Sequence, residues 1–333
     1  MATIIDVAKL AKVSKTTVSR YLNNQDKGHM SEETKRRIQE AIDQLSYAPD
    51  NMARSLKGKS TKVIGLVVND LTNPFFLQMI QGIEEELRDS GYNILMSDSN
   101  LDLNREIECL KMLEQRRIDG ILIVGVNLPV EHLKDINIKV PMVLLERDSG
   151  DSKFDSVKID NYYGAYAAVE YLIKKGYRRI AHIRGNQASM MAVHRKEAYR
   201  DCLKAHGFTW REKYEVDGNY QLKGGYAAIQ QLMALKERPD AVFCANDMSA
   251  IGVLRYLIEQ GLRVPEDMAI VGYDDVTVAS LVTPPLTTVR QPVLELAKIA
   301  TQVLLERINT KDEKNYISKS IVLKSELVIR KST

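Results

Sequence analysis

Short apolar runs alternate with amphipathic segments from about residue 61 to the end of the chain. The runs suit strands buried on both faces, and the segments between them space their apolar residues as helices do. A chain that alternates strands and helices on short connections forms parallel sheets covered by helices on both faces. We therefore predict an α/β core with helices that include 75–90, 163–175 and 248–260, and with strands at 63–68, 93–97, 120–124, 142–145, 180–183, 241–244 and 269–271.

The first 46 residues break this alternation and contain three short helical patterns. Thr3 is followed three residues later by Asp6, which is the spacing of a capping box. Ser14 and Ser31 are placed to cap the second and third helices. The third helix carries an apolar stripe at helical spacing, which consists of Ile38, Ala41, Ile42 and Leu45.

Only a few residues separate the first two helices, as in a helix-turn-helix whose second helix lies in the DNA major groove. Arg and Lys donate to guanine, and Thr bonds base edges or contacts a thymine methyl. Residues 1–60 carry 11 Lys and Arg against 7 Asp and Glu, which suggests an anionic partner but does not by itself exclude a solvated polar surface. The small and basic residues concentrated on the second helix favour DNA binding. The expected base-facing and phosphate-facing side chains are Lys15, Thr16, Ser19, Arg20, Asn23, His29, Ser31 and Thr34.

An ordered series of motifs resembles the lac repressor/gal repressor family of transcriptional regulators over nearly the whole chain. Residues 3–23 resemble the family's DNA-binding headpiece and residues 47–56 its hinge. Lys12 departs from the family, which has a turn glycine there, and a positive φ at this lysine would cost about 1 kcal/mol. Further matches are Asn73-Pro-Phe-Phe76, Asn246-Asp247, Gly272-Tyr-Asp-Asp275 and Pro284-Pro-Leu-Thr-Thr288.

The resemblance implies an all-α headpiece at 1–46, a hinge at 47–60 and a core at 61–333. The core should be similar to periplasmic sugar-binding proteins, with two parallel-sheet subdomains that the chain crosses three times and an effector between them. A hinge helix at 50–58 is too short to be stable alone and should order on DNA in a dimer. The resemblance also adds hinge residues to the DNA interface, namely Asn51, Ala53 and Leu56, with Leu56 entering the minor groove.

Polar side chains gather where the predicted strands end, which suits a polyol ligand at the carboxyl edge of the sheets. Phe75, Phe76 and Tyr220 could pack against a sugar ring. Near Arg195, the cations His194, Arg147, Arg184 and Lys223 suggest a sugar acid, unless Asp247 and Asp274 neutralise them. By resemblance, the effector-binding positions are Asn73, Phe75, Asp160, Arg195, Tyr220, Asn246 and Asp274.

Cysteine spacing and the lack of recognisable targeting or catalytic motifs disfavour other functions for this sequence. The three cysteines are far apart, so they suit a reducing compartment, and neither a secretory signal nor a membrane-spanning run is present in the sequence. A secreted sugar carrier is therefore disfavoured, and we expect a cytoplasmic protein. His182, His194 and His206 form no catalytic or metal-binding motif, so we expect no enzyme activity, metal or cofactor.

The sequence thus predicts a sugar-responsive transcriptional repressor that binds a near-palindromic operator as a homodimer. The effector is a sugar or a sugar acid. The alternative signal is a phosphorylated carrier protein, to which some relatives of this family respond.

Overall fold

The computed structural model describes residues 2–22, 30–47, 60–100, 102–124, 138–147, 154–310 and 316–333. The chain divides into two compact units, residues 1–61 and residues 62–333. The predicted hinge, including Asn51, Ala53 and Leu56, lies almost wholly outside the described residues. The finer boundaries at residues 46 and 60 therefore stay predictions.

The first unit is the three-helix arrangement that the sequence predicts. The Thr3 hydroxyl lies 2.7 Å from the Asp6 carboxylate in a capping box. Ser14 accepts from the backbone N–H of Thr17 at 3.0 Å, so it also caps as expected. Val7, Val18 and Ile38 are fully buried between the helices, and the helices are α1 (Ile4–Leu10), α2 (Lys15–Leu22) and α3 (Glu32–Leu45).

A side chain of α3 stabilises the turn between α1 and α2. Lys12 has a φ of 52°, so it occupies the left-handed region that glycine adopts without strain. The Arg37 guanidinium donates to the carbonyl of Lys12 at 3.0 Å and also to the carbonyl of Ala11. A cation at the C-terminus of α1 satisfies carbonyls that have no helical partner. Local sequence patterns gave no sign of this role for Arg37.

Lys12→Gly should raise the free energy of unfolding of the headpiece by up to about 1 kcal/mol, because it relieves the left-handed strain. Hydrogen exchange of the α1–α3 amides in the full chain measures that free energy separately from the core. The matched control is Lys9→Gly, inside α1, which should lower it by about 1 kcal/mol. A loss of protection in Lys12→Gly would contradict the interpretation of this turn.

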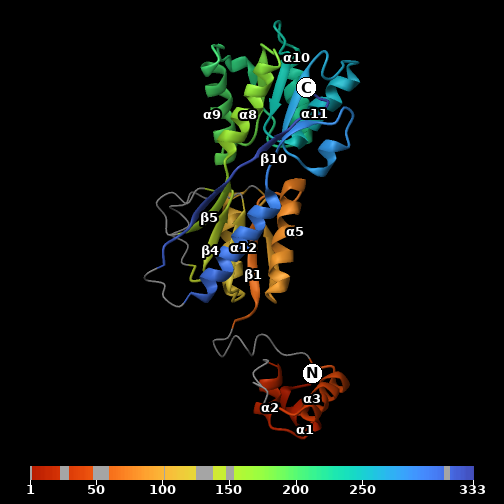
Figure 1. Cartoon of the computed structure of the whole chain (residues 1–333), viewed down its shortest axis with the longest axis vertical. Helices are drawn as coiled ribbons and strands as arrows, with labels where there is room; N and C mark the ends of the chain where they lie inside the picture. Colours follow the sequence, from red (N-terminus) through yellow and green to blue (C-terminus); the bar gives the residue numbers. More distant parts are fainter. Residues whose placement is uncertain are drawn as a thin grey trace. The chain divides into compact units, whose positions relative to one another are not determined.

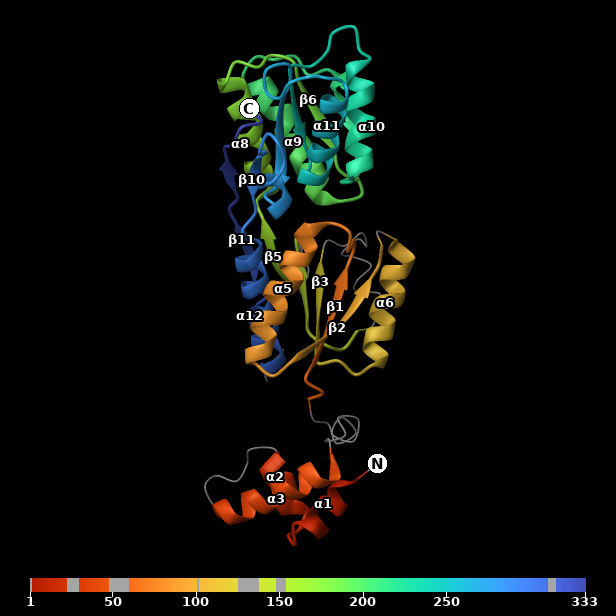
Figure 2. The same cartoon turned by 90° about the vertical axis from the view of Figure 1, so that its right-hand side faces the viewer.

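The described residues of the second unit form two six-stranded sheets. Figures 1 and 2 show this unit from two directions. Paired strands are parallel except β10 and β12, which are antiparallel. In sheet order, the first sheet is β11 (Ser320–Leu323), β5 (Asp155–Ile159), β4 (Met142–Leu145), β3 (Gly120–Val124), β1 (Val63–Val68) and β2 (Asn93–Asp98). The second is β12 (Glu326–Val328), β10 (Thr287–Arg290), β9 (Ala269–Asp274), β8 (Ala241–Cys244), β6 (Ile180–Arg184) and β7 (Glu215–Asp217).

Helices cover both faces of each sheet. On the first sheet, α5 and α12 pack on one face and α6 on the other (Figure 2). On the second, α8 pairs with α9 and α10 pairs with α11, on opposite sides (Figure 1). These helices are α5 (Pro74–Asp89), α6 (Leu103–Gln115), α8 (Asn161–Lys174), α9 (Met190–Ala205), α10 (Leu222–Met233), α11 (Asp247–Glu259) and α12 (Val293–Asn309), with 3-10 turns η1 (Glu212–Tyr214) and η2 (Thr277–Ser280).

The chain crosses between the subdomains three times among the described connections. It leaves the first sheet after β5, returns from β10 into α12, and leaves again between β11 and β12. The predicted fold class is confirmed: a helical headpiece and an α/β core of two parallel-sheet subdomains. The crossovers place polar residues of both subdomains close together.

Candidate functional site

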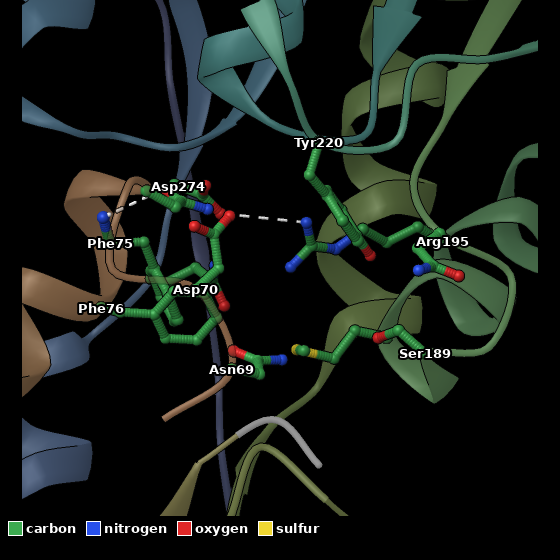
Figure 3. Close-up of a pocket in the computed structure, with 12 residues that line it drawn as sticks. Asn69, Asp70, Phe75, Phe76, Ser189, Arg195, Tyr220 and Asp274 are labelled. Atoms are coloured by element: carbon green, nitrogen blue, oxygen red, sulfur yellow. Dashed lines mark hydrogen bonds and ion pairs between the residues drawn. The ribbon is translucent and has the colours of Figure 1, made fainter. Parts of the chain in front are cut away.

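A pocket that holds about 520 Å³ of empty space, including open solvent at its mouth, lies where strands of both sheets end. Parallel strands share their carboxyl edge, so the loops that follow them meet in one place. Figure 3 shows Phe75 and Phe76 on one side of this pocket and Arg195 and Ser189 on the other. The lining residues are Asn69, Asp70, Asn73, Phe75, Phe76, Asn186, Ser189, Met191, Arg195, Tyr220, Asp274 and Gln291.

The aromatic side is built by the start of α5. Asn73 is the N-cap and accepts from the Phe75 backbone N–H at 3.0 Å, while Pro74 takes the first turn, where it loses no helical hydrogen bond. Phe75 and Phe76 are 3% and 6% exposed, and their ring centroids lie 5.2 Å apart in an edge-to-face arrangement. These two rings offer an apolar surface to a ligand ring, with the Asn73 amide beside it.

Arg195 is buried and held on several sides. Its Nε donates to Asn161 Oδ1 at 2.9 Å, and its Nη1 donates to the carbonyl of Ala245 and lies 3.8 Å from Asp274 Oδ1. The guanidinium stacks on the Tyr273 ring at 3.6 Å. Nη2 makes no hydrogen bond to any residue that the structure describes. This nitrogen is therefore a charged donor available to a pocket ligand.

Asp274 faces Arg195 from the end of β9. Its φ of 120° is in a region that side-chain-bearing residues rarely adopt. It accepts from Gln291 Nε2 at 2.6 Å, and burial raises the pKa of its carboxyl group. The Gln291 Oε1 atom is buried without a hydrogen-bond partner in the described parts of the chain. An unpartnered buried acceptor costs free energy unless a ligand or water satisfies it.

Behind the lining, Asp247 is fully buried and accepts from the Thr288 hydroxyl at 2.6 Å and the Val276 N–H at 2.9 Å. Burial, together with the neighbouring Asp274, raises its pKa well above the usual range. Two buried carboxyl groups, those of Asp247 and Asp274, thus lie near each other. Because two such charges repel in a medium of low polarity, the cluster retains protons at higher pH than isolated carboxylates do.

Tyr220 covers the pocket with its ring against Gly185. A Cβ added at Gly185 would lie 2.1 Å from Tyr220 Cζ, so only glycine admits the ring in this position. Tyr220 also has a φ of 64°, and its carbonyl accepts from Asn246 Nδ2 at 2.9 Å. Asn246 thus holds the Tyr220 loop from behind.

Two predicted effector-binding residues lie outside the lining. The Asp160 carboxylate caps α8 by accepting from the Tyr163 N–H at 2.9 Å, and the Asn246 side chain caps α11 by accepting from the Ser249 N–H at 3.0 Å. Their predicted contact with an effector therefore gains no support from the geometry. The predicted residues that do line the pocket are Asn73, Phe75, Arg195, Tyr220 and Asp274.

The lining also contains residues that sequence reasoning did not assign to the site. Asn69 follows β1, whereas Asn186 and Ser189 lie between β6 and α9, so the rule of strand ends could have found them. Ser189 is the N-cap of α9 but makes no side-chain capping bond, which leaves its hydroxyl for other partners. Gln291 lies on a crossover whose position no local pattern reveals.

The cationic surplus behind the sugar-acid hypothesis is not found in the lining. The lining includes none of the four cations that suggested a sugar acid, which are His194, Arg147, Arg184 and Lys223. Arg184 pairs instead with Asp217 at 2.9 Å and with Glu215 at 3.6 Å. The charged groups of the lining are one cation and two carboxylates, namely Arg195, Asp70 and Asp274.

The headpiece presents the expected polar face on α2. Lys15, Thr16 and Arg20 are exposed, and Ser19 is half-buried. Ser31 and Thr34 share a hydrogen bond of 2.9 Å between their hydroxyl groups at the start of α3. The other predicted DNA contacts lie outside the described residues, and these are Asn23, His29, Asn51, Ala53 and Leu56.

Two of the three histidines considered for catalysis, His182 and His206, have structural surroundings. His182 is fully buried, stacks on Phe243 at 4.9 Å, and has its pKa lowered to about 4 by burial. His206 Nδ1 lies 2.9 Å from the carbonyl of Cys202 in its own helix. Over the described residues, no group of three or more His, Cys, Asp or Glu could hold a metal ion, and no helix has the length and apolar character to span a bilayer.

Comparison with known proteins extends over both units. Residues 3–50 match "Bacterial regulatory proteins, lacI family" and residues 169–333 match "Periplasmic binding protein-like domain". The HTH-type transcriptional repressor PurR of Vibrio atlanticus is 36% identical over 319 residues, with 95% of each chain covered. The ribose operon repressor of Escherichia coli is 38% identical over 310 residues, which are 92% of this chain and 93% of that one. The crystal structure of the lac repressor dimer bound to operator and the anti-inducer ONPF superposes with a TM-score of 0.89 at 27% identity, over 100% of this chain and 99% of that one.

Proposed function

The chain belongs to the LacI family of bacterial regulatory proteins, and from this premise we propose that it is a cytoplasmic homodimeric repressor whose DNA affinity is set by a small neutral sugar. Its headpiece would bind a near-palindromic operator, since two-fold symmetry in the protein matches two half-sites in the DNA. The observation that carries the ligand part is the pocket beside Arg195, which combines an aromatic surface with available polar groups.

The base-reading residues we propose are Lys15, Thr16 and Arg20, which are exposed together on α2. Arg20→Ala should weaken operator binding by about 10- to 100-fold, because a good arginine–guanine contact contributes about 1–3 kcal/mol. Fluorescence anisotropy of a labelled operator duplex measures this change. Lys9→Ala, in α1, is the matched control and should keep affinity within about threefold. Equal losses in both variants would contradict base reading by α2.

A neutral monosaccharide suits the pocket better than a sugar acid. Its hydroxyls can accept from Arg195 Nη2 and donate to Gln291 Oε1, which lack described partners. Its apolar face can pack on Phe75 and Phe76. A carboxylate would instead meet Asp70 and Asp274 in the same lining. The similarity to a ribose operon repressor makes D-ribose the first candidate.

Calorimetry on the full chain tests this proposal with D-ribose, D-glucuronate and adenine as probes. We expect saturable binding of D-ribose and none of D-glucuronate. Binding of D-glucuronate alone would restore the sugar-acid hypothesis, and binding of adenine alone would replace the sugar with a heterocycle. Failure of a broad panel of sugars and bases would overturn the small-molecule proposal in favour of a phosphorylated carrier protein.

Gly185→Ala should weaken D-ribose binding by about 10-fold or more, since the added Cβ displaces the Tyr220 ring from the pocket. The matched control is Gly91→Ala, because a Cβ at Gly91 would meet nothing within 4 Å although its φ of 69° adds some strain. Titration calorimetry at one temperature compares the two variants. Wild-type affinity in Gly185→Ala would mean that the Tyr220 ring does not contribute to binding.

A further inference from the structure

Asn161 lies where the chain first crosses between the two subdomains of the core. It is the first residue of α8 and follows β5 by two residues. Although polar, it is only 4% exposed. It is not among the lining residues of the pocket, so its burial is not explained by direct contact with a ligand.

The Asn161 amide joins one residue of each subdomain. Its Nδ2 donates to Glu146 Oε2 at 3.2 Å and to the carbonyl of Ile159 at 3.0 Å. Its Oδ1 accepts from Arg195 Nε at 2.9 Å. The carboxylate on one side and the guanidinium on the other fix the direction of the amide, since only one orientation satisfies both.

Glu146 anchors this connection in the first subdomain. It follows β4, is 4% exposed, and has a φ of 55°. Its Oε1 accepts from the Ile159 backbone N–H at 2.8 Å, so the carboxylate holds the last residue of β5 as well as Asn161. A buried carboxylate needs such donors, because an unpaired buried charge is costly.

The opposite side of Arg195 reaches a second crossover. Asp274, 3.8 Å from Arg195 Nη1, accepts from Gln291, which lies between β10 and α12. Figure 3 shows the Arg195 guanidinium directed at Asp274 within the pocket. The ion pair is therefore tied to one crossover through Asn161 and to another through Gln291.

We propose that Asn161 is a positioning residue that couples the pocket to the first subdomain, which follows the headpiece in the chain, by linking Arg195 to Glu146 across the first crossover. A ligand that reorients Arg195 then shifts the end of β5 and the start of α8 relative to β4. This inference rests on the proposed function, since it assumes that the ligand contacts Arg195. It separates two properties of the site: how tightly the sugar binds, and how far a bound sugar changes operator affinity.

Asn161→Asp divides these two properties. The comparison is made at about pH 9, above the pKa of about 7 at Glu146, so that Glu146 carries no proton to share. The new carboxylate then still accepts from Arg195 Nε but makes no hydrogen bond to Glu146. Sugar affinity should stay within about threefold of wild type, whereas the factor by which saturating D-ribose changes operator affinity should fall to below about 2. In the wild-type protein we expect saturating D-ribose to change operator affinity by a factor of about 5 to 150, the usual range for allosteric coupling between two sites.

The double variant Glu146→Gln/Asn161→Asp should restore the coupling. The amide introduced at position 146 can accept from the Ile159 N–H and donate to the carboxylate at position 161. The link between positions 146 and 161 is thus rebuilt with reversed polarity and unchanged total charge, while the bond from position 161 to the Ile159 carbonyl stays absent in both variants. Tyr162→Phe is the matched control. It removes the neighbouring 2.9 Å bond between α8 and α9, from the Tyr162 hydroxyl to Asp201, without touching Arg195.

Anisotropy with a labelled operator duplex, with and without saturating D-ribose, gives the coupling factor for each protein. Loss in Asn161→Asp, recovery in the double variant and wild-type behaviour in Tyr162→Phe support the inference. Wild-type coupling in Asn161→Asp, or a folded double variant that remains uncoupled, would overturn it.

If D-ribose fails to bind the wild-type protein, only the proposed ligand is refuted, and the role of Asn161 still needs a test. Hydrogen exchange of the protein without ligand provides that test. Asn161→Ala should then speed exchange at both crossovers, residues 159–163 and 290–294, because Arg195 connects them. Faster exchange confined to residues 159–163 would mean a purely local role and would overturn the inference. If Asn161→Ala does not fold, Asn161→Asp is compared in the same way.

Discussion

Arg195→Met should lower the free energy of unfolding of the core by about 3–5 kcal/mol, because it leaves buried carboxylates without their cation. Asp274 loses its ion pair and Asn161 loses the donor at its Oδ1. The same variant should weaken D-ribose binding by about 10- to 100-fold, since a hydrogen bond to a charged group contributes about 1.5–3 kcal/mol. Urea unfolding and calorimetry measure the two effects.

The matched control is Arg255→Met, which removes an exposed arginine paired with Glu259 at 2.8 Å along α11. An exposed pair at this helical spacing contributes about 0.3–0.5 kcal/mol, so stability and sugar binding should hardly change. If Arg195→Met were as stable as the control, the buried cluster would not depend on its guanidinium, and our account of the pocket would be wrong.

Glu146→Gln should remove a pH-dependent loss of free energy of unfolding from the core. Burial raises the pKa of Glu146 from 4.5 to about 7, against the opposing influence of Asn161 and Arg195. A raised carboxyl pKa means that the folded state holds a proton that the unfolded state releases. Its contribution to stability is present below pH 4.5 and is lost as the pH rises to about 7, by about 3 kcal/mol in all.

The free energies of unfolding of wild type and Glu146→Gln are compared at each pH, because other groups titrate in the same pH range. His182, with a pKa lowered to about 4, changes stability with the opposite sign and cancels in the comparison. The stability of the variant relative to wild type should therefore increase by about 3 kcal/mol between pH 4.5 and pH 7. Glu259→Gln, on the surface, should show little change, and a flat difference for Glu146→Gln would refute a protonated Glu146.

The fold could be predicted largely from the sequence because its central strands are short, apolar and bounded by polar turns. The predicted bounds agree with the structure at both ends for four strands, namely β1, β3, β4 and β8. β5 could not be predicted, because Asp155 and Ser156 are polar yet buried. Asp155 accepts from the Lys319 N–H at 2.7 Å, and that partner lies more than 160 residues away in the chain.

The candidate site was only partly predictable for a similar reason. Residues at or just after strand ends, such as Asp274 and Asn73, carry a local signal, because strand ends converge at one edge of a parallel sheet. Gln291 and Asn161 owe their positions to crossovers that bring the two sheets together. Asn246 carries the same local signal as the lining residues, but its side chain caps α11 instead. Asp160, which the family resemblance supplied, caps α8. Sequence alone could not separate a cap from a ligand contact.

The central claim, an operator-binding regulator controlled through the Arg195 pocket, is tested most directly by anisotropy of a labelled duplex from upstream of the protein's own gene, titrated with and without D-ribose. We predict tight binding that weakens with salt, as phosphate contacts require, and an operator affinity that D-ribose changes at least about fivefold in wild type but not in Arg195→Met. Operator binding that D-ribose leaves unchanged, or changes equally in Arg195→Met, would contradict the claim.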